Sequence, residues 1–199
     1  VSIDAPASTT SGADITFKFP VADGSAGQVL QTDGSGNLSW VTPNIPIADQ
    51  YAITSARTST EDPVNAWARQ DNTAFSATQV KGAGVSQSSG VFTFPSTGYW
   101  LLSWTIQFYF ASGGDAGAGF NLFTTNNDGG AWTAFTNSDV GGADSNEHDI
   151  LAGQALLDIT NVSNQKVCFK SASFSSGTQI SGSTSDSRSN VVFLRIGDT

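Results

Sequence analysis

The sequence of 199 residues has one cysteine, no methionine and few charged residues. A single cysteine excludes a framework of intrachain disulfides, and in the alternating run KVCFK we expect Cys168 to be a buried structural thiol. Charged residues make up 13% of the chain, about half of the 25% typical of soluble domains. Aromatic residues reach 11%, so the composition predicts a folded, turn-rich β protein rather than a disordered chain.

Positive charge is scarce, since eight basic residues stand against 17 acidic ones and the net charge is -9. A phosphate-binding surface needs clustered Lys and Arg, so nucleic acid is excluded as a partner. No apolar run approaches the roughly 18 to 20 residues of a membrane-spanning helix, and we expect no membrane insertion. The opening VSIDAPASTT lacks a basic segment followed by an apolar one, so we expect no signal peptide in this chain.

Metal-ligating residues are also few. The one histidine, His148, lies in DSNEHDIL beside Asp144 and Glu147. Zinc needs three or four protein ligands of suitable type, which excludes it here. Oxygen ligands from Asp139, Asp144 and Glu147 leave calcium open, but their spacing matches no calcium loop. We therefore expect a solvated loop and no cofactor.

Catalytic motifs are missing as well. A Ser or Cys nucleophile usually needs a histidine base held by a third group. The sequence contains no GxSxG, no HExxH and no phosphate-cradling loop. Two aspartates that meet in space would still allow paired-carboxylate hydrolysis, although nothing favours it. We expect a protein that is not an enzyme.

What the chain does have is strand-like alternation, which is strictest in GYWLLSWTIQFYFA, residues 98–111. Its period of two predicts a long central strand, with Tyr99 and Leu101 on its mixed face. We expect Trp100 and Trp104 in the core. The apolar face carries Trp100, Leu102, Trp104, Ile106, Phe108 and Phe110.

Further strands are predicted over 90–95, 154–161, 165–174 and 190–196. The last, NVVFLRI, is apolar on both faces, with Val192, Leu194 and Ile196 against Val191 and Phe193. A strand buried on both sides of an antiparallel sheet needs a second cover, which a subunit interface supplies. We assign four residues to this interface: Tyr99, Leu101, Val191 and Phe193. Turns such as NNDGG and SDVGG, with no amphipathic helix, predict an all-β sandwich, specifically a jelly roll.

A composition shift near TPNIPIADQ places a domain boundary near residue 48. Residues 1–48 form a small N-terminal β arm, and 49–199 form the jelly roll. Asp23-Gly24 and Asp33-Gly34 are turn dipeptides, and 28–32 and 37–41 are expected to pair antiparallel. A lone hairpin is marginal in water, so sister chains or a partner would hold it; a flap on its own jelly roll is the alternative. The proposed attachment residues are Val21, Asp23, Gly24, Gln28, Val29, Leu30, Asp33, Gly34, Leu38 and Trp40.

Two stretches resemble known families. GVFTFPSTGYWLLSW resembles the central signature of C1q/TNF-like heads, in which G-x-F-x-x-P-x-x-G-x-Y joins two strands of a ten-stranded jelly roll. Matching positions are Gly90, Phe92, Pro95, Gly98 and Tyr99 or Trp100. The ending NVVFLRIGDT is similar to the closing strand of that fold and to tails of phage and marine-virus structural proteins. The resemblance implies a homotrimer packed about a threefold axis.

ADGSAGQVLQTDGSGNLSWVTP is similar to the module DGTxGQVLxTDGSGNLSW of phage fibre and virion-surface proteins. The resemblance implies a bacteriophage virion protein. As a capsid decoration (cement) protein it would bind the major capsid protein or other virion proteins; as a tail-fibre knob it would bind a host surface glycan or protein through residues 111–150. Tail fibres usually carry a longer N-terminal region, which favours decoration.

The missing signal peptide disfavours a third role, a secreted lectin-like head. For the knob role, the candidate ligand loop contains Trp132, Asp144, Glu147 and His148. Trp132, in DGGAWTAF beside a turn, is the ring best placed to stack on a sugar, although we expect it to pack against the protein.

Overall fold

The computed structural model describes residues 16–43, 47–69, 80–111, 115–142 and 144–199. The chain divides into two compact units, Val1–Asn44 and Ile45–Thr199. The boundary expected near residue 48 falls inside a strand of the second unit, β3 (Ile47–Ile53), whose first residue is already buried. The jelly roll therefore begins a few residues earlier than the composition shift suggests.

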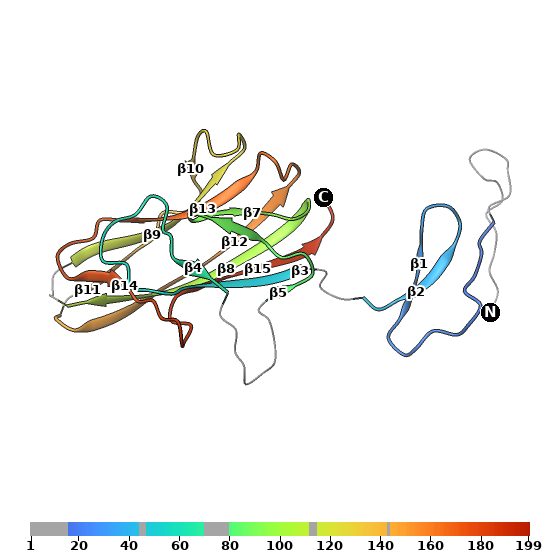
Figure 1. The fold of residues 1–199 in the computed structure, drawn as a ribbon, viewed down its shortest axis with the longest axis horizontal. Helices are drawn as coiled ribbons and strands as arrows, with labels where there is room; N and C mark the ends of the chain where they lie inside the picture. Colours follow the sequence, from blue (N-terminus) through green and yellow to red (C-terminus); the bar gives the residue numbers. More distant parts are fainter. Residues whose placement is uncertain (1–15, 44–46, 70–79, 112–114, 143) are drawn as a thin grey trace. The chain divides into compact units, whose positions relative to one another are not determined.

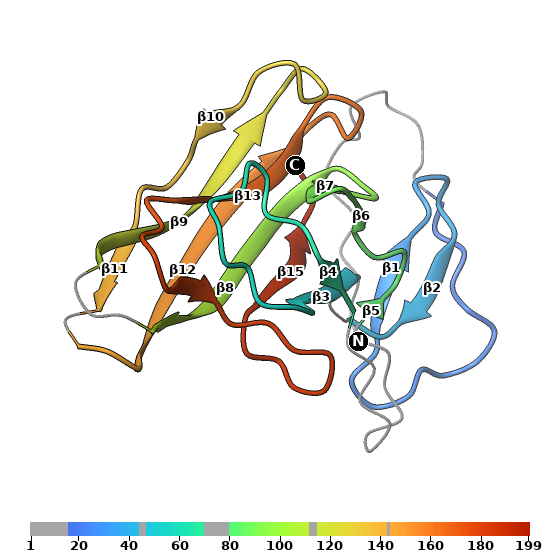
Figure 2. The same cartoon turned by 60° about the vertical axis from the view of Figure 1, so that its left-hand side comes forward.

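The second unit is a sandwich of two antiparallel sheets (Figures 1 and 2), and the described residues contain no helix. One sheet has the order β10-β9-β13-β7-β6, with β11 also paired to β9. Its strands are β6 (Ser86–Ser88), β7 (Val91–Thr93), β9 (Asp115–Thr125), β10 (Thr133–Ala134), β11 (Asp139–Gly142) and β13 (Lys166–Ala172).

The other sheet has the order β12-β8-β15-β3-β4, with β14 also paired to β8 and β5 to β3. Besides β3 it contains β4 (Trp67–Ala68), β5 (Val80–Lys81), β8 (Gly98–Phe110), β12 (Glu147–Ile159), β14 (Thr178–Ile180) and β15 (Asn190–Gly197). The first unit contains one antiparallel ribbon, β1 (Val29–Thr32) with β2 (Leu38–Val41).

The strands predicted from alternation are confirmed. β8 buries every second residue from Trp100 to Phe110, as period two requires, and Trp100 and Trp104 both lie in the core. In β12, Ala155, Leu157 and Ile159 are buried while their neighbours are exposed. Both flanking partners of β8 come from distant sequence, β12 at one side and β15 at the other.

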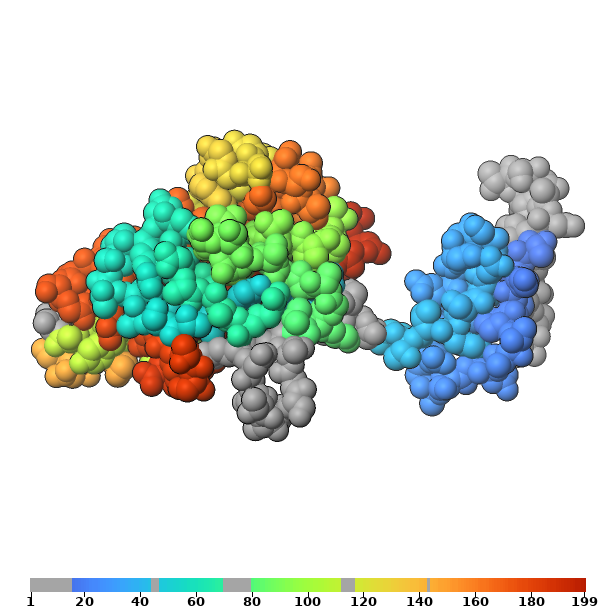
Figure 3. Space-filling view, in the orientation of Figure 1, coloured from blue at the N-terminus to red at the C-terminus, as the bar shows by residue number. Residues whose placement is uncertain are grey.

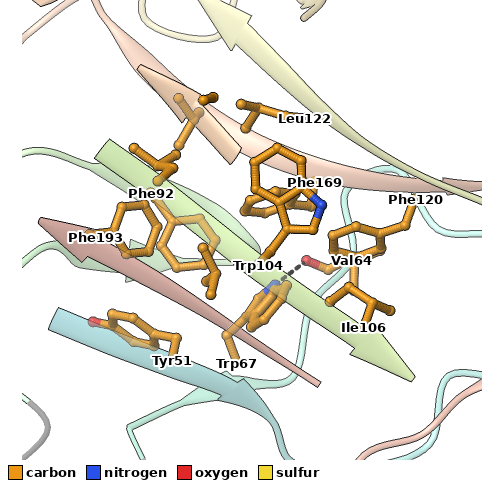
Figure 4. Packing of buried hydrophobic residues seen from close by; sticks show 14 of the residues in the cluster. Tyr51, Val64, Trp67, Phe92, Trp104, Ile106, Phe120, Leu122, Phe169 and Phe193 are labelled. Carbon is orange, nitrogen blue, oxygen red and sulfur yellow. Dashed lines mark hydrogen bonds between the residues drawn. The ribbon is translucent and has the colours of Figure 1, made fainter. Parts of the chain in front are cut away.

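The space between the sheets is filled by aromatic rings from both layers (Figure 4). Phe169 stacks on Phe120, with ring centroids 5.0 Å apart, and Trp104 meets Phe169 edge-on at 5.4 Å. The Trp67 indole donates to the Val64 carbonyl oxygen at 2.8 Å. Each fully buried ring of this kind stabilises the fold by about 1.5–3 kcal/mol through burial alone, so the sandwich needs no disulfide.

One glycine makes room for this core. Gly153 of β12 pairs with Trp104 of β8, and a Cβ at position 153 would lie 2.3 Å from Cζ2 of the indole. The missing side chain lets the ring lie against the β12 backbone. Cys168 is buried, as expected, and burial raises the pKa of its thiol to about 12.

Candidate functional site

The side of β12-β8-β15-β3 that faces away from the core is open in the single chain. We call it the outer sheet face. It is made of the outward-pointing residues of these strands and of β14. They are Ala48, Gln50, Tyr99, Leu101, Ser103, Thr105, Gln107, Tyr109, His148, Ile150, Ala152, Gln154, Leu156, Asp158, Gln179, Asn190, Val192 and Leu194, together with Ala52, which is fully buried.

The outer sheet face is almost without charge. Among its residues only Asp158 is acidic and none is Lys or Arg, in a chain with 17 acidic residues, and Lys81 of β5 pairs with Ala48 at its border. One row across the sheet is wholly apolar, because Leu101 pairs with Leu156 on one side and with Leu194 on the other. Leu156 is 56% exposed and Ile150 is 57% exposed. Large apolar side chains gathered on an uncharged surface are typical of protein interfaces.

Two of the four predicted interface residues lie on this face, Tyr99 and Leu101. The assignment of Val191 and Phe193 is wrong. Both are fully buried between the sheets, where the Phe193 ring lies 5.0 Å from that of Phe92. NVVFLRI is apolar on both sides, so the sequence did not reveal which side faces inward. The register decides, because Phe193 pairs with the inward-facing Leu102.

The residues of the predicted ligand loop do not lie together in the structure. Thr133, next to Trp132, pairs with Thr124 near one end of β9, whereas Gly142 pairs with Asp115 at the other end. The separation is about 30 Å along the strand, given roughly 3.3 Å per residue. Positions 112–114 and 143 of this region lie outside the described residues.

The prediction of a solvated loop around His148 is wrong, because β12 begins at Glu147 and His148 is its second residue. The His148 ring lies 4.9 Å from the Tyr109 ring across the β12-β8 pair, at one end of the outer sheet face. Asp144 is exposed in the turn before β12, where its backbone amide donates to the Glu147 carboxylate at 3.1 Å. Searched over the described ranges, His, Cys, Asp and Glu form no group of three that could hold a metal ion.

The N-terminal ribbon is closed by the predicted turn at Asp33-Gly34. The Asp33 carboxylate accepts from the backbone amides of Ser35 at 2.8 Å and Asn37 at 3.1 Å, and from the Asn37 side-chain amide at 2.6 Å. These bonds, chiefly that from the Asn37 side chain, lower the pKa of Asp33. Gly34 and Gly36 have φ values of 80° and 88°, which glycine adopts at little cost.

The other predicted turn lies elsewhere. The chain turns at Ala26-Gly27, where the Gln28 amide donates to the Ser25 carbonyl oxygen at 3.1 Å, rather than at Asp23-Gly24. Gly24 serves a different purpose, because a Cβ there would lie 2.5 Å from the Trp40 indole. The same indole donates to the Ala22 carbonyl oxygen at 2.9 Å. Trp40 thus fastens the segment before β1 to β2.

The N-terminal unit has no buried residue anywhere in 16–43. Leu38 is half-buried, and the other large apolar side chains of the attachment set are exposed. A two-stranded ribbon without a covered face is marginal in water. The exposed large apolar side chains of the unit are Phe17, Phe19, Val21, Val29, Leu30 and Trp40.

A pocket of about 390 Å³ opens at one edge of the sandwich, between the end of β12, β10 and the start of β13. The buried Leu157, Ile159 and Val167 line it from within, and the exposed Thr133 and Phe135 line it at the surface. In Figure 3 the segment that carries β10 and the turn before β13 lie side by side along this edge. Part of this lining lies in the region 111–150 proposed for the knob role, but no motif singled out its residues, which come from four stretches: 124–126, 131–135, 157–159 and 165–167.

Elsewhere the buried polar groups are structural. The Asp49 side chain, fully shielded from solvent, accepts from Arg69 at 2.8 and 2.7 Å and from the Val85 amide at 2.7 Å. The Arg69 guanidinium lies 4.7 Å from the Tyr51 ring centroid, and the Tyr51 hydroxyl donates to the Val85 carbonyl oxygen. Burial raises the pKa of Tyr51. This network joins Asp49 and Tyr51 of β3 to Arg69 and Val85, and it leaves none of these side chains free to react.

Known proteins are similar to this chain in fold. Eiger TNF from S. frugiperda superposes with a TM-score of 0.55 at 14% identity, over 77% of this chain and 95% of that one. The fold is TNF-like. Murine APRIL gives a TM-score of 0.54 at pH 5.0 and 0.50 at pH 8.0, with 10% and 9% identity, over 75% of this chain and 98% of that one.

Sequence comparison adds nothing to the structural likeness, because no family model and no curated protein matches the chain. At 14% identity or less, the likeness to solved structures concerns the fold alone. The sequence-based assignment to a C1q/TNF-like jelly roll is confirmed. No helix in the described part of the chain is long and apolar enough to cross a membrane.

Proposed function

We propose that the protein is a non-enzymatic structural component of a bacteriophage virion, a homotrimer that decorates the capsid surface. The jelly rolls would meet through the outer sheet face, and the N-terminal units would attach the trimer to the major capsid protein or another virion protein. The observation that carries the proposal is the uncharged outer sheet face with its apolar row Leu156–Leu101–Leu194.

Two further copies of the chain are the occupants that suit this face. It is broad, regular and almost uncharged, so a face of the same kind can pack on it without leaving buried charges unpaired. The homotrimer implied by the C1q/TNF-like resemblance uses one such surface from every subunit. Asp158 lies at one end of the face and pairs across the strands with Tyr99, so the centre of the face stays free of charge.

The N-terminal unit supports the attachment role. Its Phe17, Phe19 and Trp40 are exposed in the described residues 16–43, and exposed apolar side chains of this kind mark a surface that a partner covers. The likeness of 19–43 to a phage-fibre module points to a virion protein as that cover. Three such units on one trimer bind together, which raises affinity by about two orders of magnitude or more over a single unit.

The trimer is tested by placing a charge on the outer sheet face. Leu156→Asp adds a carboxylate at an exposed position of β12 that would be buried between subunits. We expect light scattering after size exclusion to show monomers or a strongly weakened trimer, because an unpaired buried charge costs several kcal/mol. Ser86→Asp, on the exposed edge strand β6 of the other sheet, is the matched control and should leave the trimer intact. A monomeric wild-type chain would contradict the proposal.

The location is tested by antibody labelling of intact particles, read by electron microscopy. Label spread over the head is the expected result. Label confined to the tail or fibre tips would replace decoration by the second candidate, a receptor-binding knob. The observation that favours this second role is the open pocket beside β10, a feature that a purely structural subunit does not need.

A further inference from the structure

The pocket between β12, β10 and β13 has the size and lining of a small-ligand site. Its volume of about 390 Å³ falls within the roughly 300–1,000 Å³ of ligand pockets. The interior is formed by side chains of the core, Leu157, Ile159 and Val167, whereas the rim is polar and aromatic. An apolar interior with a few polar groups at the rim suits a ligand that has one apolar side and several hydroxyls.

The polar side chains at this rim are not engaged with the protein. Thr124, Asn126 and Thr133 line the pocket, and within the described structure their side-chain polar atoms make no hydrogen bond to another residue. Gln165, by contrast, is committed to its own turn, since its carbonyl oxygen accepts from the amides of Thr160 and Asn161 at 2.7 Å. The hydroxyls of Thr124 and Thr133 and the side-chain amide of Asn126 are thus free to bind a ligand.

An aromatic ring completes the rim. Phe135 follows β10, is 50% exposed and lines the pocket. Its position is fixed by the backbone, because its amide donates to the Leu122 carbonyl oxygen at 2.8 Å. A large aromatic ring left half in water beside free hydroxyl and amide groups offers an apolar face to one side of a ligand, and these groups offer hydrogen bonds to its edge.

The charges at the rim select against ionic ligands. Lys166 lines the pocket, but its ammonium group is paired with Asp128. The other charged residue there, Asp158, has its side chain on the outer sheet face, on the opposite side of β12 from the buried Leu157 and Ile159. A phosphate, sulfate or carboxylate ligand would therefore find no free cation here, whereas a neutral polyol would find acceptors and donors.

We propose that this pocket binds a neutral saccharide, about one or two sugar units in size. The apolar face of a pyranose ring lies against Phe135, and its hydroxyls bond to Thr124, Asn126 and Thr133. The site is independent of the proposed homotrimer and is consistent with either virion location. It differs from the ligand loop expected from sequence, since Trp132 does not line it and 144–148 lie at the other end of β9.

The test uses the full chain and saturation-transfer NMR with the methyl glycosides of glucose, galactose, mannose and N-acetylglucosamine as probes. We expect at least one of them to bind with a Kd in the range of about 1 mM, weak because few contacts offset the loss of ligand freedom. Phe135→Ala should weaken this binding about tenfold or more. Thr133→Trp, at an exposed strand position, should fill the rim and abolish it.

Phe19→Ala is the matched control, because Phe19 is 52% exposed and lies in the other unit; it should bind like the wild type. The proposal is overturned if none of the glycosides gives a saturable signal, or if Phe135→Ala and Thr133→Trp bind as well as wild type. Stronger binding of butylammonium than of any glycoside would also overturn it, since the chain would then prefer an apolar cation to a neutral saccharide. The oligomeric state, measured on the same samples, reports separately on the proposed function.

Discussion

Asp33 shows how one side chain closes the N-terminal ribbon. Its carboxylate accepts hydrogen bonds from the backbone amides of Ser35 and Asn37 and from the Asn37 side chain. Gly34 and Gly36 of the same turn have positive φ. Asp in a turn of this kind bonds to its own backbone a few residues on. The ordered ribbon therefore depends on a charged group, although it lies in a chain that has few.

The turn is expected to weaken in acid. The pKa of Asp33 in the folded state is lowered from its ordinary value of 3.8, chiefly by the Asn37 side chain. Its stabilising contribution is therefore complete above pH 3.8 and is lost as the pH falls through the lower folded value. An NMR titration of the Ser35 and Asn37 amides should show this. Asp33→Asn should remove the transition, and an unchanged transition in that variant would assign the titration to another group.

Cys168 illustrates the opposite case, a reactive group made inert by its surroundings. It is buried beside the core, and burial raises the pKa of its thiol to about 12. Because the thiolate is the reactive form, the native protein at pH 8 should react with a thiol-specific dye far more slowly than the urea-unfolded chain. Equal rates in the two states would show that the strand β13 opens readily.

Among the elements, β15 best shows what a sequence pattern leaves undecided. Its neighbour β8 has only Trp, Phe, Leu and Ile on one side, whereas the other side mixes Tyr and Leu with Ser, Thr and Gln, so the inward face was predictable. β15 has Val191 and Phe193 on one side and Val192 and Leu194 on the other, and hydrophobicity alone does not separate them. Only pairing with β8 fixes the choice.

Substitution separates the two faces of β15. Phe193→Ala should lower the free energy of unfolding by about 3–5 kcal/mol, as large-to-small changes in a packed core do. Leu194→Ala, the matched control on the outer sheet face, should cost much less in a sample diluted to the monomer. Urea unfolding at low protein concentration measures both. A larger loss of unfolding free energy for Leu194→Ala than for Phe193→Ala would mean that Leu194, and not Phe193, faces the core.

The pocket was not predictable from sequence for a different reason. Phe135 belongs to no repeated pattern, and the groups around it come from the end of β9, the residues around β10 and the turn before β13. Trp132, which the sequence favoured as an exposed ring, is half-buried and lies close to Gly129. Strand alternation predicts which residues are inside a sandwich, but not which loops meet at its edge.

At the scale of the whole molecule, the chain divides its tasks between two units. The jelly roll has the core and the outer sheet face, while the described part of the N-terminal unit, 16–43, has exposed apolar side chains and no buried residue. A unit without a core contributes little to the folding of the other. Removal of the N-terminal unit should therefore leave the jelly roll, and any trimer it forms, intact.

We expect a chain without residues 1–43 to fold and assemble like the full chain but to be absent from the virion. Circular dichroism and light scattering check the first part, and mass spectrometry of purified particles checks the second. A variant with Leu30 and Trp40 both changed to Ser, which keeps the full length, is the control for truncation and should also be lost. Incorporation of the truncated protein at normal levels would refute the attachment role.

β8 is the strand from which the rest of the arrangement follows. It buries one side in the sandwich, pairs along both edges with β12 and β15, and has its remaining side on the outer sheet face. In the proposed trimer it has no side left in water. Its thirteen residues would therefore accept substitutions most slowly in evolution. The residues around Phe135 at the pocket rim are free to vary as the ligands they bind vary.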